Sequence, residues 1–208
     1  MYQPTHPVER PEDLRAILGE TRPTQIHKNI DHIDPFIRAW VERTPFVVIA
    51  SASPSGQMDA SPKGDPPGFV KVLDDKTLAI PDRIGNQRGD TFFNLLEDPR
   101  VGLIFIIPQR KEVVRINGTG QVVQDPGLLD QMGHKGHRPD LALVVRVHEA
   151  FYHCGKAMIR SRLWQPEHWP ALDGLPTYAE ALKRHAALPD PLEDIEEAMA
   201  LNERDRLY

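Results

Sequence analysis

Residues 77–107, TLAIPDRIGNQRGDTFFNLLEDPRVGLIFII, decide how this chain folds. A short apolar run at 78–80 is typical of a β-strand, and a polar loop follows it. Asn86 is a favourable N-cap for the next segment, and the Asp98-Pro99 pair ends that segment because proline cannot continue a helix. We therefore predict a strand, a loop, a short helix and a strand covered on both faces. The apolar stripe at helical spacing consists of Phe92, Phe93, Leu95 and Leu96.

The loop before this predicted helix carries two arginines, Arg83 and Arg88. The first amides of a helix have no partner within the helix, and the helix dipole is positive at that end. Each guanidinium also presents a fork of donors that matches a phosphate. Two interpretations are open from these residues alone. The loop is either a phosphate site or an exposed turn whose arginines pair with Asp82 and Asp90.

Length and composition limit the class of protein. The chain has 208 residues, a formal net charge of -5 and no basic run, which argues against nucleic acid as its main partner. No apolar stretch is long enough to span a bilayer, and the first residues lack the apolar core of a signal peptide, so we expect no membrane partner. The single Cys154 cannot form an internal disulfide. We expect a cytoplasmic protein, because that compartment is reducing.

The rest of the chain reads as short strands with helices at both ends. Residues 1–32 form an arm with one short helix, and Asp34-Pro35 opens a firmer helix that packs on a sheet. Apolar or alternating runs at 46–53, 57–64, 68–73, 112–124 and 141–153 predict strands. Gly118 and Gly120 indicate a bend or bulge where a barrel turns a corner. Short turns between the strands favour an antiparallel barrel over a parallel sheet.

After the last strand the pattern becomes helical. The segment CGKAMIRSRLW predicts a helix with Lys156 and Arg160 on one face, which suits a solvated surface or an anionic group. The tail from 178 to 207 predicts two helices divided at Leu188-Pro189. Its second half is charged and amphipathic, so we expect it to pack on the body or on a partner.

Several segments in a fixed order carry a resemblance to a known family. SPKGD at the end of the second strand, then LAIPDRIGNQRGDTFFNLLEDPRVGLIFIIP, then EVVRINGTGQV, resemble the pyridoxamine 5'-phosphate oxidase-like flavoproteins, which are split β-barrels that bind FMN. CGKAMIRSRLW is similar to an FMN-dependent sub-branch whose substrates are unassigned. The resemblance implies a mainly β protein with an N-terminal arm at 1–32, an FMN-binding split-barrel domain at 33–165 and a C-terminal helical extension at 166–208.

The resemblance also implies FMN as the cofactor and names its contacts. Lys63 matches the family's lysine late in the second strand, and the loop that holds the FMN phosphate matches three residues here. In that family the sites lie at a homodimer interface, where a late basic residue of the other subunit closes over the flavin. No catalytic side chain and no metal ligand is implied. The implied cofactor-binding residues are Ser61, Lys63, Arg83, Asn86, Arg88, Lys156, Arg160 and Ser161.

The resemblance has departures that bear on the reaction. Met58 replaces the arginine that opens the second-strand motif, Pro62 interrupts it, and LLDQMGHKGHRPD stands where the family grips its substrate phosphate. Oxidation of pyridoxamine 5'-phosphate is therefore not implied. We expect an oxidoreductase that moves a hydride or electrons between a small molecule or NAD(P)H and an acceptor through FMN. One alternative is a deazaflavin-dependent reductase. The other is a non-catalytic protein that binds or senses FMN, haem or another tetrapyrrole, and the candidate histidines for such binding are His134, His137, His148 and His153.

Overall fold

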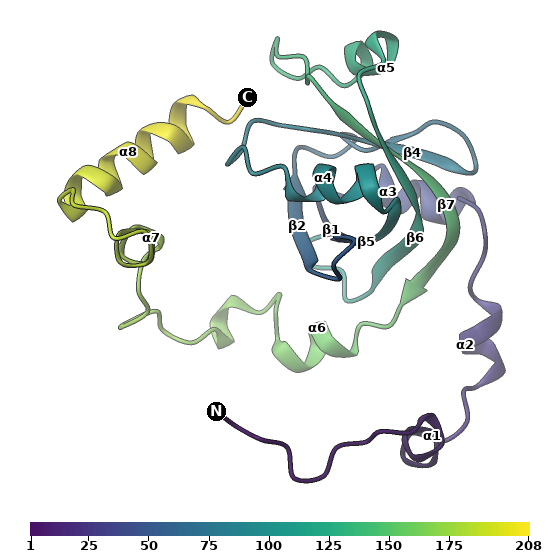
Figure 1. Ribbon diagram of the computed structural model, residues 1–208. Helices are drawn as coiled ribbons and strands as arrows, with labels where there is room; N and C mark the ends of the chain where they lie inside the picture. The colour runs from purple at the N-terminus through teal and green to yellow at the C-terminus, as the bar shows by residue number, and fades with distance from the viewer.

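One antiparallel sheet of seven strands forms the framework of the protein. In the computed structural model, which describes all 208 residues, the strand order is β2-β1-β5-β6-β7-β4-β3, with every neighbouring pair antiparallel. The sheet curls on itself, but its edge strands β2 and β3 do not pair, so the barrel is split (Figure 1). The predicted antiparallel split β-barrel is confirmed. The strands are β1 Phe46–Ala52, β2 Met58–Gly64, β3 Lys71–Val72, β4 Thr77–Pro81, β5 Arg100–Ile106, β6 Val113–Val123 and β7 Ala142–His153.

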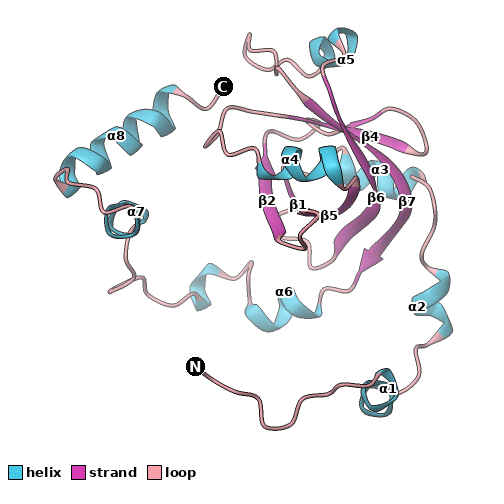
Figure 2. Cartoon of the chain, viewed as in Figure 1, coloured by secondary structure: helices cyan, strands magenta, loops and turns pink.

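Helices flank the sheet and extend from both ends of the chain (Figure 2). Helix α4 lies across the curl of the sheet and contacts β1, β2 and β6, while α3 packs against β6. The Asp34 carboxylate caps α3 by accepting the amide of Ile37, as the sequence predicts. The helices are α1 Pro11–Leu18, α2 Pro23–His27, α3 Pro35–Val41, α4 Asp90–Glu97, α5 Pro126–Gln131, α6 Lys156–Ser161, α7 Tyr178–His185 and α8 Leu192–Asp205, with a 3-10 turn at Pro166–His168.

The longest strand pair, β6 with β7, bends at a β-bulge between Asn117 and Gly118. A Cβ atom on Gly118 would lie 2.1 Å from the carbonyl oxygen of Arg146, which is far inside van der Waals contact. Only glycine therefore allows the two backbones to approach here. The predicted bend at this glycine is confirmed, and it lets the sheet curl.

The main core fills the inside of the curl. Alternate residues of β1 and β5, such as Ile49 and Phe105, point into it, and α3 adds Trp40, whose indole donates to the Phe105 carbonyl at 3.3 Å. The opposite face of β5 is only partly covered, since Ile104 is 37% exposed while Gly102 and Ile106 are half-buried. The expectation that β5 is covered on both faces is therefore wrong for the single chain. A continuous apolar run does not reveal which molecule covers its second face.

Strand β2 borders the split. Its inward-facing side chains include Ser61 and Lys63, which are half-buried, whereas Pro62 between them is exposed. Pro62 lies opposite Val48 of β1. A proline has no amide hydrogen, so it fits a sheet only where its nitrogen faces away from the pairing strand. The outer edge of β2 therefore lacks a donor at this position.

The two terminal extensions stand clear of the barrel over most of their length (Figure 1). Helices α1, α2 and α6 contain no buried residue. Helices α7 and α8, divided at Leu188-Pro189 as predicted, pack on each other and bury Ala179 and Ile195. After α8 the chain returns to the split, where Tyr208 contacts the barrel.

Candidate functional site

A cavity of about 660 Å³ opens at the split of the barrel. Its walls come from the end of β2, the loop after β4, the start of α4, the segment before β7 and the returning tail. Five of the eight residues that the sequence nominates for a cofactor line this cavity together. They are Ser61, Lys63, Arg83, Asn86 and Arg88.

Two crossed ion pairs join the strands on either side of the split. The Lys63 ammonium lies 3.0 Å from the Asp82 carboxylate, and the Arg83 Nε lies 2.7 Å from the Asp65 carboxylate. Each side of the split thus contributes one cation and one anion. The side chain of Asp65 is only 2% exposed, so the Arg83 pair is shielded from water. Arg83 was expected to pair with Asp82 if the loop were an ordinary turn; its partner is instead Asp65, which lies next to the end of β2.

The loop between β4 and α4 turns sharply before the helix begins. Asn86 does not cap α4, because the helix starts at Asp90 with Gly89 as its N-cap residue. The Asn86 side chain instead accepts the Arg88 amide at 3.0 Å, a local turn that competes with helix capping. Gln87 and Gly89 have φ values of 60° and 67°, in the left-handed region. The predicted cap was therefore wrong by three residues, although the loop and helix stand where the sequence places them.

Arg88 is the most accessible cation of this loop. Its Nε lies 2.7 Å from the Asp90 carboxylate, and the two side chains are 70% and 44% exposed. This hydrogen bond raises the pKa of Arg88 above its ordinary value. The pairing with Asp90 matches the second interpretation of the sequence. Because an exposed pair contributes little free energy, the guanidinium can leave Asp90 for a stronger anion.

The cavity combines charged groups with an apolar wall. Its cationic side chains are Lys63, Arg83, Arg88 and Arg138, and its carboxylates are Asp82, Asp90 and Asp140. The Lys63 ammonium also lies 5.2 Å from the centre of the Phe92 ring. Phe93 and Leu96, which belong to the predicted apolar stripe of the helix, are exposed on the helix and line the cavity. Such a mixture suits a ligand with a flat apolar body and a charged end.

Arg138 and Tyr208 line the cavity without having been nominated from the sequence, and His137 was named only for the tetrapyrrole alternative. Arg138 lies in a glycine-rich loop and is paired with Asp130 at 2.7 Å. Tyr208 reaches the cavity only because the tail folds back. No local signal marks such a residue, since the contact joins positions that are far apart in the chain.

The other three nominated residues, Lys156, Arg160 and Ser161, do not line the cavity. All three are exposed on α6, which follows β7 at the end of the sheet away from α5 (Figure 2). The Ser161 hydroxyl donates only to a carbonyl of its own helix. No group of three or more His, Cys, Asp or Glu side chains is arranged to hold a metal ion.

The family of this chain follows from a sequence profile. The profile described as "Pyridoxamine 5'-phosphate oxidase" matches residues 33–154, which is more than half of the chain. The chain therefore belongs to the pyridoxamine 5'-phosphate oxidase family. A search of curated proteins found no match.

Several solved structures are similar to this chain at low sequence identity. HupZ from Group A Streptococcus is 17% identical over 58% of this chain and 93% of its own, with a TM-score of 0.47. A putative pyridoxamine 5'-phosphate oxidase from Lactobacillus delbrueckii is 19% identical over 59% and 95%, with a TM-score of 0.47. An FMN-binding protein from Syntrophomonas wolfei is 10% identical over 68% and 95%, with a TM-score of 0.43.

None of the helices here combines the length and apolar character needed to cross a bilayer.

Proposed function

We propose that the cavity at the split binds FMN, with the phosphate held by the loop before α4 and by Lys63. The observation that carries this proposal is the convergence of Lys63, Arg83, Asn86 and Arg88, from two separate segments, on one cavity. Membership of the family supports the same cofactor. A volume of about 660 Å³ lies within the range of pockets for ligands of this size. The residues present therefore fit the group.

The charges in the cavity fit a phosphate ester. Such an ester carries close to two negative charges at neutral pH, and charge-assisted hydrogen bonds to it are stronger than those between neutral groups. Arg88 is held only by an exposed pair and is free to turn toward the phosphate. Lys63 and Arg83 are fixed by the crossed ion pairs and need no rearrangement to present their remaining donors. Asp82, Asp90 and Asp140 offset three of the four positive charges that line the cavity.

The function we propose is an FMN-dependent oxidoreductase acting on a small molecule or NAD(P)H. Bound FMN would supply hydride and electron transfer, and the protein would orient the reactants. Phe92, Phe93 and Leu96 offer an apolar surface that excludes water from the ring. Ser61 points to the cavity from the same strand face as Lys63 and is placed to donate to the cofactor. We assign no catalytic side chain, and oxidation of pyridoxamine 5'-phosphate is not part of the proposal, because Met58 stands in place of the motif's arginine.

The cofactor can be identified directly. The full chain is purified without added flavin, its absorption spectrum is recorded, and any released small molecule is identified by mass. We expect flavin absorption bands and the mass of FMN. Bleaching by NADH or NADPH without oxygen would support an oxidoreductase over a storage or sensing protein. A chain that neither retains FMN nor binds added FMN would overturn the proposal, and a deazaflavin mass would replace it with the related reductase.

We also propose that the protein is a homodimer in which α6 of one copy closes over the flavin of the other. Lys156, Arg160 and Ser161 are exposed and lie outside the cavity of their own chain, so only a second copy would bring them to it. The open face of β5 at Ile104 and the extensions at 1–32 and 166–208 offer the surface for such contacts. Light scattering should give twice the chain mass. Lys156→Ala and Arg160→Ala should weaken FMN binding, and a monomer that binds FMN at full affinity would overturn the dimer.

A second candidate function has one observation in its favour. The His137 side chain lines the cavity, and an imidazole in a pocket is the usual axial ligand of haem iron. The alternative is therefore a non-catalytic tetrapyrrole-binding protein. Haemin titration distinguishes the two functions: a Soret band that is lost in His137→Ala would favour haem. An unchanged haemin spectrum in both proteins would remove this alternative.

A further inference from the structure

Tyr208 makes a set of contacts that the proposed FMN site does not require. Its phenol donates to the Asp65 carboxylate at 2.7 Å. Its ring centre lies 5.8 Å from the guanidinium carbon of Arg83 and 5.1 Å from the ammonium of Lys135. The ring also leans on His134, with ring centres 4.8 Å apart and planes tilted by 46°. The tail is therefore attached to the cavity wall by one aromatic residue with several partners.

These contacts converge on Arg83. Its Nε donates to one oxygen of Asp65, whose other oxygen accepts the Tyr208 phenol, and its Nη2 donates to the Met132 carbonyl at 2.9 Å. The Tyr208 ring lies against the guanidinium. The Arg83 side chain is only 16% exposed. Its Nη1 has no partner within the chain, so this end remains for a ligand in the cavity that Arg83 lines.

Arg88 lines the same cavity but is much less restrained than Arg83. It has a single carboxylate partner and is 70% exposed. Such a side chain must lose rotamer freedom when it binds a ligand, which lowers affinity. Arg83 has lost that freedom before the ligand arrives. Its pre-organisation depends on Asp65 keeping one orientation, and the Tyr208 phenol is the group that occupies the second oxygen of that carboxylate.

We propose that Tyr208 is a positioning residue for the phosphate site: by holding Asp65 and Arg83 in place, it couples FMN affinity to docking of the C-terminal tail. This inference rests on the proposed FMN function and adds a residue that lies outside the part of the chain matched to the family. Coupling of this kind is reciprocal, so bound FMN should hold the tail by the same factor. The Asp65 hydrogen bond raises the pKa of the Tyr208 phenol, which therefore remains the donor at neutral pH.

The test compares FMN with riboflavin, which lacks the phosphate. Both are titrated into the flavin-stripped full chain by flavin fluorescence, using the wild type, Tyr208→Phe and Tyr208→Leu. Loss of about one charge-assisted hydrogen bond and the ring contact should weaken FMN binding by roughly five- to tenfold in Tyr208→Leu, and less in Tyr208→Phe, which keeps the ring. Riboflavin affinity should not change. Tyr178→Phe is the matched control, because that tyrosine is 69% exposed on α7.

Two further measurements separate a positioning role from a structural one. In an Arg83→Ala background, Tyr208→Leu should cause no additional loss of FMN affinity, because the residue acts through Arg83. Hydrogen exchange at the tail should slow when FMN is bound to the wild type. Urea unfolding should be the same in the wild type, Tyr208→Phe and Tyr208→Leu, since Tyr208 lies outside the core clusters.

The outcomes distinguish the two proposals. If the wild type binds FMN and Tyr208→Leu binds it equally well, the positioning role is wrong and the FMN function stands. If Tyr208→Leu binds FMN more tightly, the tail covers the cavity instead of preparing it, and the inference is again overturned. If the wild type binds neither flavin, the proposed function and this inference both fall.

Discussion

Replacing Arg88 by alanine tests the phosphate site at its most accessible cation. The Arg88–Asp90 pair is 2.7 Å long and largely exposed, so breaking it costs little free energy. One hydrogen bond from a guanidinium to a phosphate contributes about 1.5–3 kcal/mol. We therefore expect Arg88→Ala to bind FMN with roughly 5- to 30-fold weaker affinity than the wild type. Stability should hardly change.

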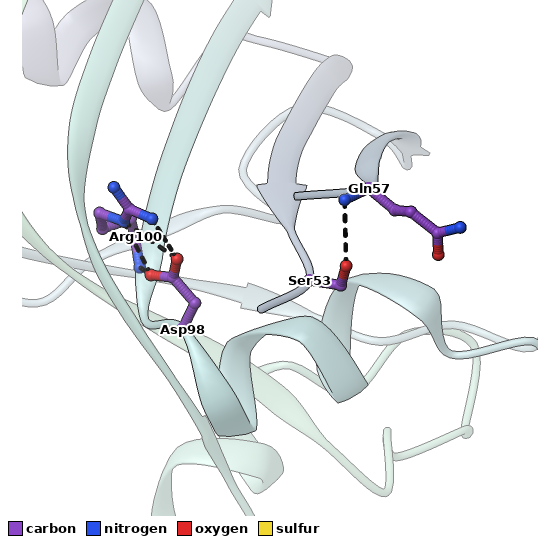
Figure 3. A network of polar contacts seen from close by, with 4 residues as sticks. All are labelled: Ser53, Gln57, Asp98 and Arg100. Carbon is purple, nitrogen blue, oxygen red and sulfur yellow. Dashed lines mark hydrogen bonds and ion pairs between the residues drawn. The ribbon is translucent and has the colours of Figure 1, made fainter. Parts of the chain in front are cut away.

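Flavin fluorescence titration measures this loss, and Arg100→Ala is the matched control. Arg100 is likewise paired with an aspartate two positions away, Asp98, and its side chain is 81% exposed. Figure 3 shows the Arg100 guanidinium forked on Asp98, near the turn where Ser53 accepts the Gln57 amide. Arg100 does not line the cavity, so its removal should leave FMN affinity unchanged.

Riboflavin decides whether the lost interaction involves the phosphate. Arg88→Ala should bind riboflavin as the wild type does, and added salt should weaken FMN binding less in this variant than in the wild type, because one screened cation is missing. Equal FMN affinity in Arg88→Ala and the wild type would refute the reasoning. So would an equal loss for FMN and riboflavin, which would place Arg88 at the ring or in the fold instead of at the phosphate.

Three further predictions concern the framework around the site. Gly118→Ala should lower the free energy of unfolding by about 3 kcal/mol, since its Cβ would lie 2.1 Å from a β7 carbonyl oxygen. Gly102→Ala is the control and should destabilise far less, because the nearest atom to its added Cβ would be 3.4 Å away. Equal urea midpoints for the two variants would contradict this prediction. Asp34→Ala should lower the free energy of unfolding by about 1 kcal/mol, because it removes the cap of α3. Asp34→Asn should keep most of this stabilisation, since asparagine also caps helices; similar losses in both variants would contradict the capping role. The hydrogen bond to Asp65 raises the pKa of the Tyr208 phenol in the folded protein. This contact therefore stabilises docking of the tail fully at pH values below the ordinary pKa of tyrosine, and the stabilisation is lost as the pH rises through the raised pKa of the folded state. In an absorbance titration of the tyrosines, the phenol that ionises at the highest pH should be missing in Tyr208→Phe. A titration curve identical to that of the wild type would contradict the Tyr208–Asp65 contact.

The order of elements around the site could be predicted because the hydrophobic period changes at each boundary. The segment 77–107 folds as a strand, loop, helix and strand, and the glycine at the β6 bulge stands where the alternating pattern indicated a bend. The exact start of α4 could not be predicted. Asn86 suits both a cap and a local turn, and only the left-handed Gly89 decides between them.

Part of the site could be predicted from the sequence because five of its residues lie in two short motifs. Lys63 and the loop arginines are close in sequence to the signals that mark the strand and helix ends. Tyr208 and Arg138 depend on how a tail and a glycine-rich loop return to the split, and no local pattern encodes such long-range contacts. The pairing of Arg83 with Asp65 was missed for the same reason.

The unpaired border of β2 has a consequence for solubility. An exposed strand edge is a template on which another chain can add a strand and begin a fibril. If the cavity binds FMN as proposed, this border stays open to admit the cofactor and is not covered by another strand of the barrel. Pro62 removes one donor from that border, and the charge of Lys63 stands beside it. Pro62, which interrupts the family's apolar run, therefore reduces the number of backbone donors with which a neighbouring molecule could pair along this edge.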